Sequence, residues 1–219
     1  MSLYWIITYC ISFQSDFHLG AGITLVGGNL HGLRLDDEGF PYMPDTQVRG
    51  LLRLGGYKLK TWMPTTKYAD LFSDNFGSSK KMSANSWSFT SAYYPSKPSG
   101  INCADDAGIL IQQSHIKQQN NIAENLFSYQ KCGPVEHFDS WQGKIYSVEP
   151  ASEMDVAFLI ACMRAEDRIG HRRSRGYGKV IWKPESVASY EPGGKPEKRK
   201  EKLQYWIGLL MNHKKGELS

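Results

Sequence analysis

The sequence predicts an α+β fold of the ferredoxin-like type, in which two β-α-β units share one antiparallel sheet. Three observations predict it. Residues 3–13 alternate as a strand does, and β-branched and aromatic residues dominate them. Residues 45–60 and 152–163 carry helix-start signals followed by apolar residues at helical spacing. Segments of strand character fill the remaining positions of the order strand, helix, strand, strand, helix, strand, at residues 87–94, 144–148 and 178–183.

The first strand, at residues 3–13, is apolar on much of both faces, which predicts a position inside the sheet. Residues 20–32 follow and hold five glycines. We expect this stretch to be a loop whose backbone can approach a ligand closely, and not a regular element.

The first helix is expected to run to about residue 60, with Asp45 or Thr46 as its cap. Arg49 and Arg53 are four residues apart and so share one helix face. Positive charge near a helix start opposes the helix dipole. Because keeping Arg49 and Arg53 there has this cost, we expect their positive charge to serve a function.

A loop and a projecting arm are expected as an insertion at about residues 95–130. Residues 109–117 and 126–130 have the pattern of hairpin strands around a polar tip, with too little apolar material for a core of their own. Residues 64–86 are polar and are expected to be irregular.

The second helix begins with Ser152-Glu153-Met154-Asp155, which resembles a capping box. We expect one domain over residues 1–190, followed by a charged tail at residues 191–219. Within the tail, residues 191–202 are expected to be solvated and residues 203–211 to form a short helix.

The composition permits an anionic partner but does not demand one. The chain has 219 residues, a formal net charge of +4 and 41% hydrophobic residues, enough for a core. Its four cysteines form no CxxC pair and lack zinc-ligand spacing, and Cys10 and Cys162 are expected to be buried thiols. Since we recognise neither a secretory signal nor a membrane-spanning run, we expect a cytoplasmic protein.

The basic, glycine-punctuated segment GHRRSRGYGK at residues 170–179 is the strongest functional signal. Glycines let successive backbone N–H groups point at an anion, arginines add bidentate phosphate contacts, and a tyrosine offers a stacking face. The alternative is a solvated basic turn. The candidate RNA-binding residues here are Gly170, His171, Arg172, Arg173, Arg175, Gly176, Tyr177 and Gly178.

A second candidate region joins the glycine-rich stretch to the start of the first helix. It comprises Gly20, Gly22, Thr46, Arg49 and Arg53. Free backbone N–H groups before a helix can hold a phosphate. The alternative is an ordinary connection between a strand and a helix.

Four segments together resemble the CRISPR-associated RAMP superfamily. They are HLGAG at residues 18–22, DEGFPYMPDTQVRGLLR at 37–53, SHIKQQNNIAENLFSYQ at 114–130 and IGHRRSRGYGKV at 169–180. Length and motif order are most similar to the repeated backbone subunit of type III effector complexes. The resemblance implies a modified RNA recognition motif with a thumb-like arm.

The resemblance also implies roles for particular residues. Residues 44–53 and 170–178 would hold the backbone of a guide RNA. The arm, with His115 and Lys117, would wedge between bases of the duplex of guide and target RNA. The implied partners are guide RNA, target RNA, other effector subunits, and copies of the chain or paralogues stacked in a filament, with no membrane.

Two departures from the family pattern bear on catalysis. Asp45 stands where the family usually has glycine, and residues 28–31 lack the aspartate that target-cleaving members place there. The remaining candidates are His31, as a base for a 2′-OH, and the turn acids Asp36 and Asp37, which look structural. Whether the chain is an enzyme therefore stays open at this point.

The leading hypothesis is a guide-coating subunit that needs no cofactor for binding. One alternative is an endoribonuclease of the same superfamily, either a metal-dependent one acting on target RNA, with a divalent ion such as Mg²⁺, or one that processes guides. Another is a protein-interaction module without an RNA role. A steep salt dependence of RNA affinity would favour the RNA-binding hypotheses.

Overall fold

The computed structural model describes the chain except residues 1–2, 26–29, 63–65, 78–85, 97–100, 104–107, 109, 120–121, 136–137, 171–175 and 216–219. At residues 21–25, 30–31, 66–67, 110–119, 122–129 and 213–215 it describes the backbone alone. The elements are β1 (Tyr4–Phe13), β2 (Gly20–Leu25), β3 (Leu30–Leu33), α1 (Asp45–Trp62), α2 (Thr66–Phe76), β4 (Trp87–Phe89), β5 (Leu110–Gln119), β6 (Ile122–Cys132), β7 (Ser140–Ser147), α3 (Glu153–Ala165), β8 (Val180–Tyr190), β9 (Glu197–Lys198) and α4 (Leu203–Lys215).

A five-stranded antiparallel sheet, in the order β4-β7-β1-β8-β9, forms the centre of the molecule. Helix α1 lies along the chain between β1 and β4, and α3 connects β7 to β8. Each of these strand pairs has one antiparallel strand between its members, so two β-α-β units interleave in one sheet. The predicted α+β class and the interior position of β1 are both confirmed.

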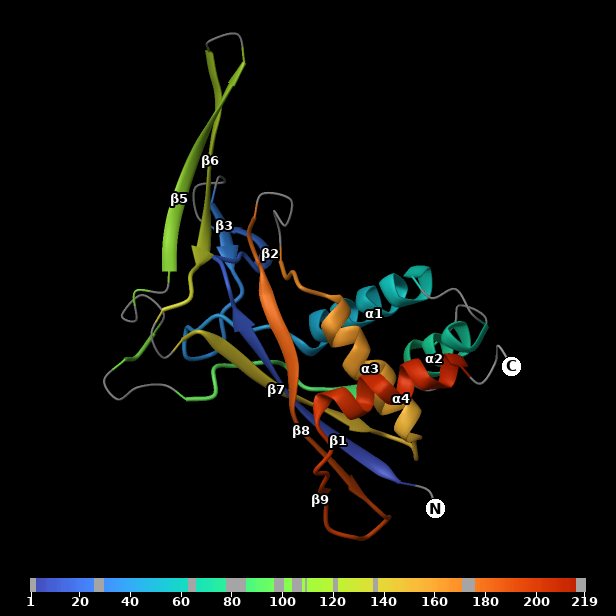
Figure 1. The fold of residues 1–219 in the computed structure, drawn as a ribbon. Helices are drawn as coiled ribbons and strands as arrows, with labels where there is room; N and C mark the ends of the chain where they lie inside the picture. Colours follow the sequence, from blue (N-terminus) through green and yellow to red (C-terminus); the bar gives the residue numbers. More distant parts are fainter. Residues whose placement is uncertain are drawn as a thin grey trace.

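One face of this sheet carries the core, and all four helices lie on that side (Figure 1). The alternation of β1 buries Trp5, Ile7, Tyr9 and Ile11 completely. Burying such a side chain contributes about 1.5–3 kcal/mol to the stability of the fold. A slip of one residue would expose all four, so the buried face of β1 fixes the register of the sheet.

Helix α3 lies inside the helical layer, because eight consecutive residues from Val156 to Met163 are buried. Its predicted capping box is confirmed. Asp155 N–H donates to Ser152 Oγ at 3.2 Å, and Ser152 N–H donates to Asp155 Oδ2 at 2.9 Å. The predicted buried thiols are also confirmed at Cys10 and Cys162, and burial raises the pKa of the Cys162 thiol well above its usual range.

A second sheet, in the order β2-β3-β6-β5, carries the long β5–β6 hairpin that projects from the molecule (Figure 1). The predicted hairpin is confirmed, with longer strands than expected. The prediction that residues 20–32 form no regular element is wrong, because β2 and β3 pair there. Their register shifts between Gly20 and Thr24, and such an irregularity accommodates glycine within a strand.

Two further segments are more ordered than the sequence predicts. Residues 64–86 contain α2, whose Tyr68, Leu71, Phe72 and Phe76 are buried at helical spacing. In the tail, residues 191–198 are exposed as predicted, but Trp206 and Leu210 of α4 join the core. No described helix combines the length and apolarity needed to cross a bilayer.

Candidate nucleic-acid interface

Backbone conformation favours glycine at three positions of the loop between α3 and β8, residues 170–178. Gly170, Gly176 and Gly178 have φ angles of 71°, 88° and 70°, a region that L side chains rarely adopt. A Cβ at Gly178 would lie 1.9 Å from Ile169 O, and one at Gly170 would lie 2.3 Å from His18 O. The loop therefore owes its path to glycine. The predicted site residues His171, Arg172, Arg173 and Arg175 lie outside the described residues.

The two ends of this glycine loop are tied to the segment that follows β1. Gly178 N–H donates to Asp16 O at 2.7 Å, and Ile169 N–H donates to Gly178 O at 2.8 Å. Lys179 N–H donates to Ser15 Oγ at 2.9 Å. These bonds fix the positions of the two described ends of the loop, at Ile169 and at Gly178 and Lys179.

A hollow of about 360 Å³ opens beside the glycine loop, lined by Ser15, Asp16, Gly176 and Tyr177. Lys131 Nζ lies 2.6 Å from Asp16 Oδ2 and 5.6 Å from the centroid of the Tyr177 ring. An ammonium group, an aromatic ring and an exposed glycine thus meet at one place. This combination suits a phosphate and its neighbouring base.

Sequence reasoning missed Asp16 and Lys131. They are 115 positions apart, and no spacing rule connects them. The backbone explains their meeting, because Phe17 and Cys132 exchange N–H···O bonds of 2.7 and 2.8 Å at the base of the hairpin. The one local sign of this site in the sequence was the carboxylate of Asp16, just before the HLGAG motif.

The HLGAG segment lies with the glycine loop rather than with α1. His18 is buried, its Nδ1 contacts Gln130 O, and its own carbonyl lies against Gly170. Gly20 and Gly22 continue into β2, where Gly20 pairs with Leu33. The structure therefore brings the start of the HLGAG segment, at His18, against Gly170.

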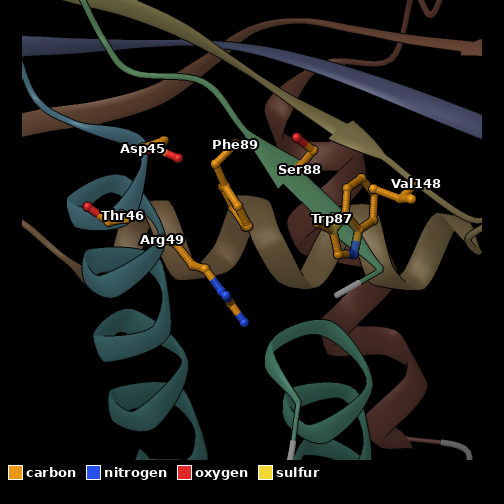
Figure 2. A pocket seen from close by; sticks show the side chains of 7 residues that line it. All are labelled: Asp45, Thr46, Arg49, Trp87, Ser88, Phe89 and Val148. Atoms are coloured by element: carbon orange, nitrogen blue, oxygen red, sulfur yellow. The ribbon is translucent and has the colours of Figure 1, made fainter. Parts of the chain in front are cut away.

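A second hollow, of about 330 Å³, lies where α1 begins (Figure 2). Figure 2 shows Arg49 reaching from α1 toward the space between that helix and β4. The helix starts at Asp45, and Val48 N–H donates to Pro44 O at 2.9 Å, so Pro44 holds the position predicted for Asp45 or Thr46 as cap. The residues lining this α1 hollow are Asp45, Thr46, Arg49, Trp87, Ser88, Phe89 and Val148.

The predicted cations of α1 differ in their surroundings. Arg49 is half-buried and lines the hollow, whereas Arg53 is exposed and its guanidinium carbon lies 5.8 Å from the Tyr57 ring centroid. Thr46 joins Arg49 at the rim, where a hydroxyl and a guanidinium can both donate to an anion. Asp45 is exposed there and opposes that anion.

The candidate catalytic residues do not assemble a site among the described residues. Asp36 Oδ1 accepts the backbone N–H groups of Glu38 and Phe40 at 3.0 and 2.8 Å, so Asp36 shapes its turn. Asp37 is exposed. The backbone of His31 lies in β3, paired with Thr24 and Tyr129, so its prediction as a loop residue is wrong. In the described part of the chain no three His, Cys, Asp or Glu residues gather as a divalent ion would require.

The arm residues His115 and Lys117 belong to β5, opposite Phe127 and Asn125 of β6. Two positions apart on a strand, they share one face of the hairpin. The register shifts directly after Lys117, which locally bends and twists the arm.

Comparison with known proteins gives one family. The sequence matches the model of the RAMP superfamily over residues 10–181, which is most of the chain. No curated protein sequence matches it.

Two solved structures resemble the fold. A chain from the cryo-EM structure of the type III-B Cmr-beta bound to cognate target RNA has a TM-score of 0.59 and 11% identity, over 82% of this chain and 96% of that chain. A chain from the type III-B Cmr-beta in the apo state gives 0.59 and 11%, over 82% of this chain and 97% of that one. At this identity the similarity shows the fold.

Proposed function

The chain belongs to the RAMP superfamily, and on that premise we propose that it is a guide-RNA-binding subunit of a type III CRISPR effector ribonucleoprotein. In this role it coats the guide RNA and positions target RNA. The glycine loop is the observation that carries the proposal. Its three left-handed glycines and anchored ends flank the RRSR run in the sequence, and Tyr177 in the same loop lies beside Lys131.

The glycine loop suits a phosphate backbone better than a base sequence. Backbone N–H groups and arginines bind phosphate oxygens whatever base is attached, which is what a protein that coats variable guides requires. The ring of Tyr177 can stack on any base, because every base has a π-face. Affinity should therefore be insensitive to sequence and steeply dependent on salt.

The α1 hollow supplies a second proposed contact to the RNA backbone, through Thr46 and Arg49. Asp45 weakens this contact by its charge. The projecting hairpin, with His115 and Lys117, is proposed to wedge between bases of the guide–target duplex. The similar chain from the Cmr-beta structure belongs to a complex bound to target RNA, which supports an RNA partner here.

The proposed partners are guide RNA, target RNA, other subunits of the effector, and copies of this chain or paralogues along a filament. Binding is proposed to need no cofactor. A divalent ion such as Mg²⁺ would enter only if the chain also cleaved RNA.

RNA that co-purifies with the protein from its native host provides the decisive test, read by sequencing. We expect short RNAs that join a constant repeat-derived end to a variable segment. Protein free of nucleic acid at physiological salt, with its native partners present, would contradict guide coating. That outcome would favour the protein-interaction module.

Arg172→Ala/Arg173→Ala/Arg175→Ala tests the glycine loop itself. Removing three phosphate-binding charges should weaken RNA binding for all sequences and reduce the slope of log affinity against log salt by about 2, measured by filter binding. Lys195→Ala/Lys200→Ala/Lys202→Ala removes the same charge from the exposed tail and serves as control. Unchanged affinity in the loop variant would remove the glycine loop from the RNA site.

Cleavage is tested separately. Because Asp36 bonds its own turn and Asp37 is exposed, Asp36→Ala and Asp37→Ala should each leave any target cleavage largely intact, measured on labelled target RNA with Mg²⁺. Loss of cleavage in a variant that still folds and binds would identify the missing catalytic acid.

A further inference from the structure

The central sheet has a second face that none of the described helices covers. Side chains alternate along β1, so while Trp5, Ile7 and Tyr9 are buried among the helices, Tyr4, Ile6 and Thr8 stay partly exposed on the other side. Paired residues of antiparallel strands share a face. The register places Lys144, Tyr146, Ser186, Ala188 and Tyr190 opposite these three, with Ser88 and Lys198 one strand further out. Gln142 and Lys183 pair with Cys10, the next residue of β1 on this face, and Tyr93 pairs with Gln142. We define the open face by these residues.

Tyrosine rings are the first unusual feature of the open face. Tyr4 stacks on Tyr190 with ring centroids 5.5 Å apart, at one end of the pairing between β1 and β8. Tyr93, which is 43% exposed, stacks on Tyr42 with centroids 5.3 Å apart and an interplanar angle of 6°. Tyr146 lies opposite Ile6, between these pairs along the sheet. Rings held parallel in this way let a nucleobase continue the stack.

Lysines are the second feature. Lys144 lies opposite Thr8, Lys183 opposite Cys10 and Lys198 opposite Ala188, and all three are exposed. Glu185, the unpaired residue at the register shift in β8, is the one acid of the described strands that reaches this face, where it accepts a 3.0 Å hydrogen bond from Gln142 Nε2. The open face therefore combines net positive charge with aromatic rings.

We infer that the open face binds a single-stranded segment of RNA, with bases stacked on the tyrosines and phosphates beside the lysines. A duplex would not serve, because its bases are already stacked on one another. A protein partner suits the face less well. Lysines are depleted from the centres of protein interfaces, and Lys144 and Lys183 flank the central strand β1. The inference rests on the proposed function, since it adds a second surface for the same class of ligand.

The test uses the full chain with two fluorescent probes of equal length, an oligouridylate and an abasic ribose-phosphate oligomer. Tyr93→Leu/Tyr146→Leu should weaken oligouridylate binding at least about fivefold and leave binding of the abasic probe unchanged, because only a base can stack. Lys144→Gln/Lys183→Gln should weaken binding of both probes and lower the salt slope by about 1.4. Fluorescence anisotropy over a salt series measures all of these.

Lys60→Gln/Lys202→Gln is the matched control, because both lysines are exposed on the helical side and the charge loss is equal. Circular dichroism checks that each variant folds. If both open-face variants bind as the control does, while the arginine variant of the glycine loop loses affinity, the inference is wrong and the proposed function stands. If the unaltered protein binds neither probe nor its own guide RNA, the proposed function fails and the inference fails with it.

Discussion

The glycine loop and the α1 hollow are both proposed to hold a phosphate, but they are built in opposite ways. The loop depends on backbone conformation, with Gly170 and Gly178 enclosed so tightly that a Cβ would lie 2.3 and 1.9 Å from a carbonyl oxygen. The α1 hollow depends on side chains, with Arg49 and Thr46 presented by a regular helix. The first site should therefore fail abruptly on mutation, and the second should change by degrees.

The largest expected effect is at Gly178. Gly178→Ala combines a φ of 70° with a backbone clash, and we expect it to lower the free energy of unfolding by at least about 3 kcal/mol, measured by urea denaturation. Gly176→Ala has a similar φ but open space, so about 1 kcal/mol is expected.

Gly50→Ala completes this series in the exposed part of α1, where nothing lies within 4 Å of the added Cβ. It should raise stability by about 0.5–1 kcal/mol, because alanine favours the helix. Equal losses at Gly178 and Gly176 would show that strain, and not the close approach of Ile169, dominates in the loop.

An intermediate effect is expected in the α1 hollow. Arg49→Ala should weaken RNA binding about tenfold, or about 1.4 kcal/mol, because the lost guanidinium lines the hollow. Arg53→Ala removes the same charge one turn on, from a side chain beside Tyr57, and should cost less than about threefold. Anisotropy titrations in which both variants lose affinity equally would mean that the helix attracts RNA by overall charge alone.

The smallest expected effect is a gain. Asp16 pairs with Lys131 and so competes with a phosphate for the ammonium group. Asp16→Asn should tighten RNA binding about threefold and steepen its salt dependence. The pair is partly exposed, so stability should fall by no more than about 1 kcal/mol. Weaker binding would instead show that Asp16 positions Lys131 for the RNA.

Regions held by contacts between neighbours in the sequence could be predicted, whereas regions held by contacts between distant residues could not. The capping box, the alternation of β1 and the hairpin depend on neighbours in sequence, and all were predicted. The strands β2 and β3 were missed because glycine masks the alternation of a strand, and only the pairing with β6 reveals them. The Asp16–Lys131 pair depends on strands brought together by the fold.

The C-terminal segment shows the same limit. The predicted exposure is confirmed at residues 191–198, but the sequence did not predict that Arg199 would be partly buried and reach Glu153 at 2.7 Å, or that Trp206 would pack edge-on against Trp5 at 6.0 Å. In α2 the apolar spacing was present in the sequence, and the many polar residues around it obscured it.

The position of β1 has a consequence for biosynthesis. This strand leaves the ribosome before both of its partners, which are β7, from Ser140, and β8, which ends at Tyr190. At about 5–20 residues per second, β1 waits on the order of ten to forty seconds for its last neighbour. Until β7 emerges both edges of this apolar strand are unpaired and open to association with other chains, and one edge stays unpaired until β8 emerges. We therefore expect the yield of native protein to depend on chaperones that cover β1 in the nascent chain.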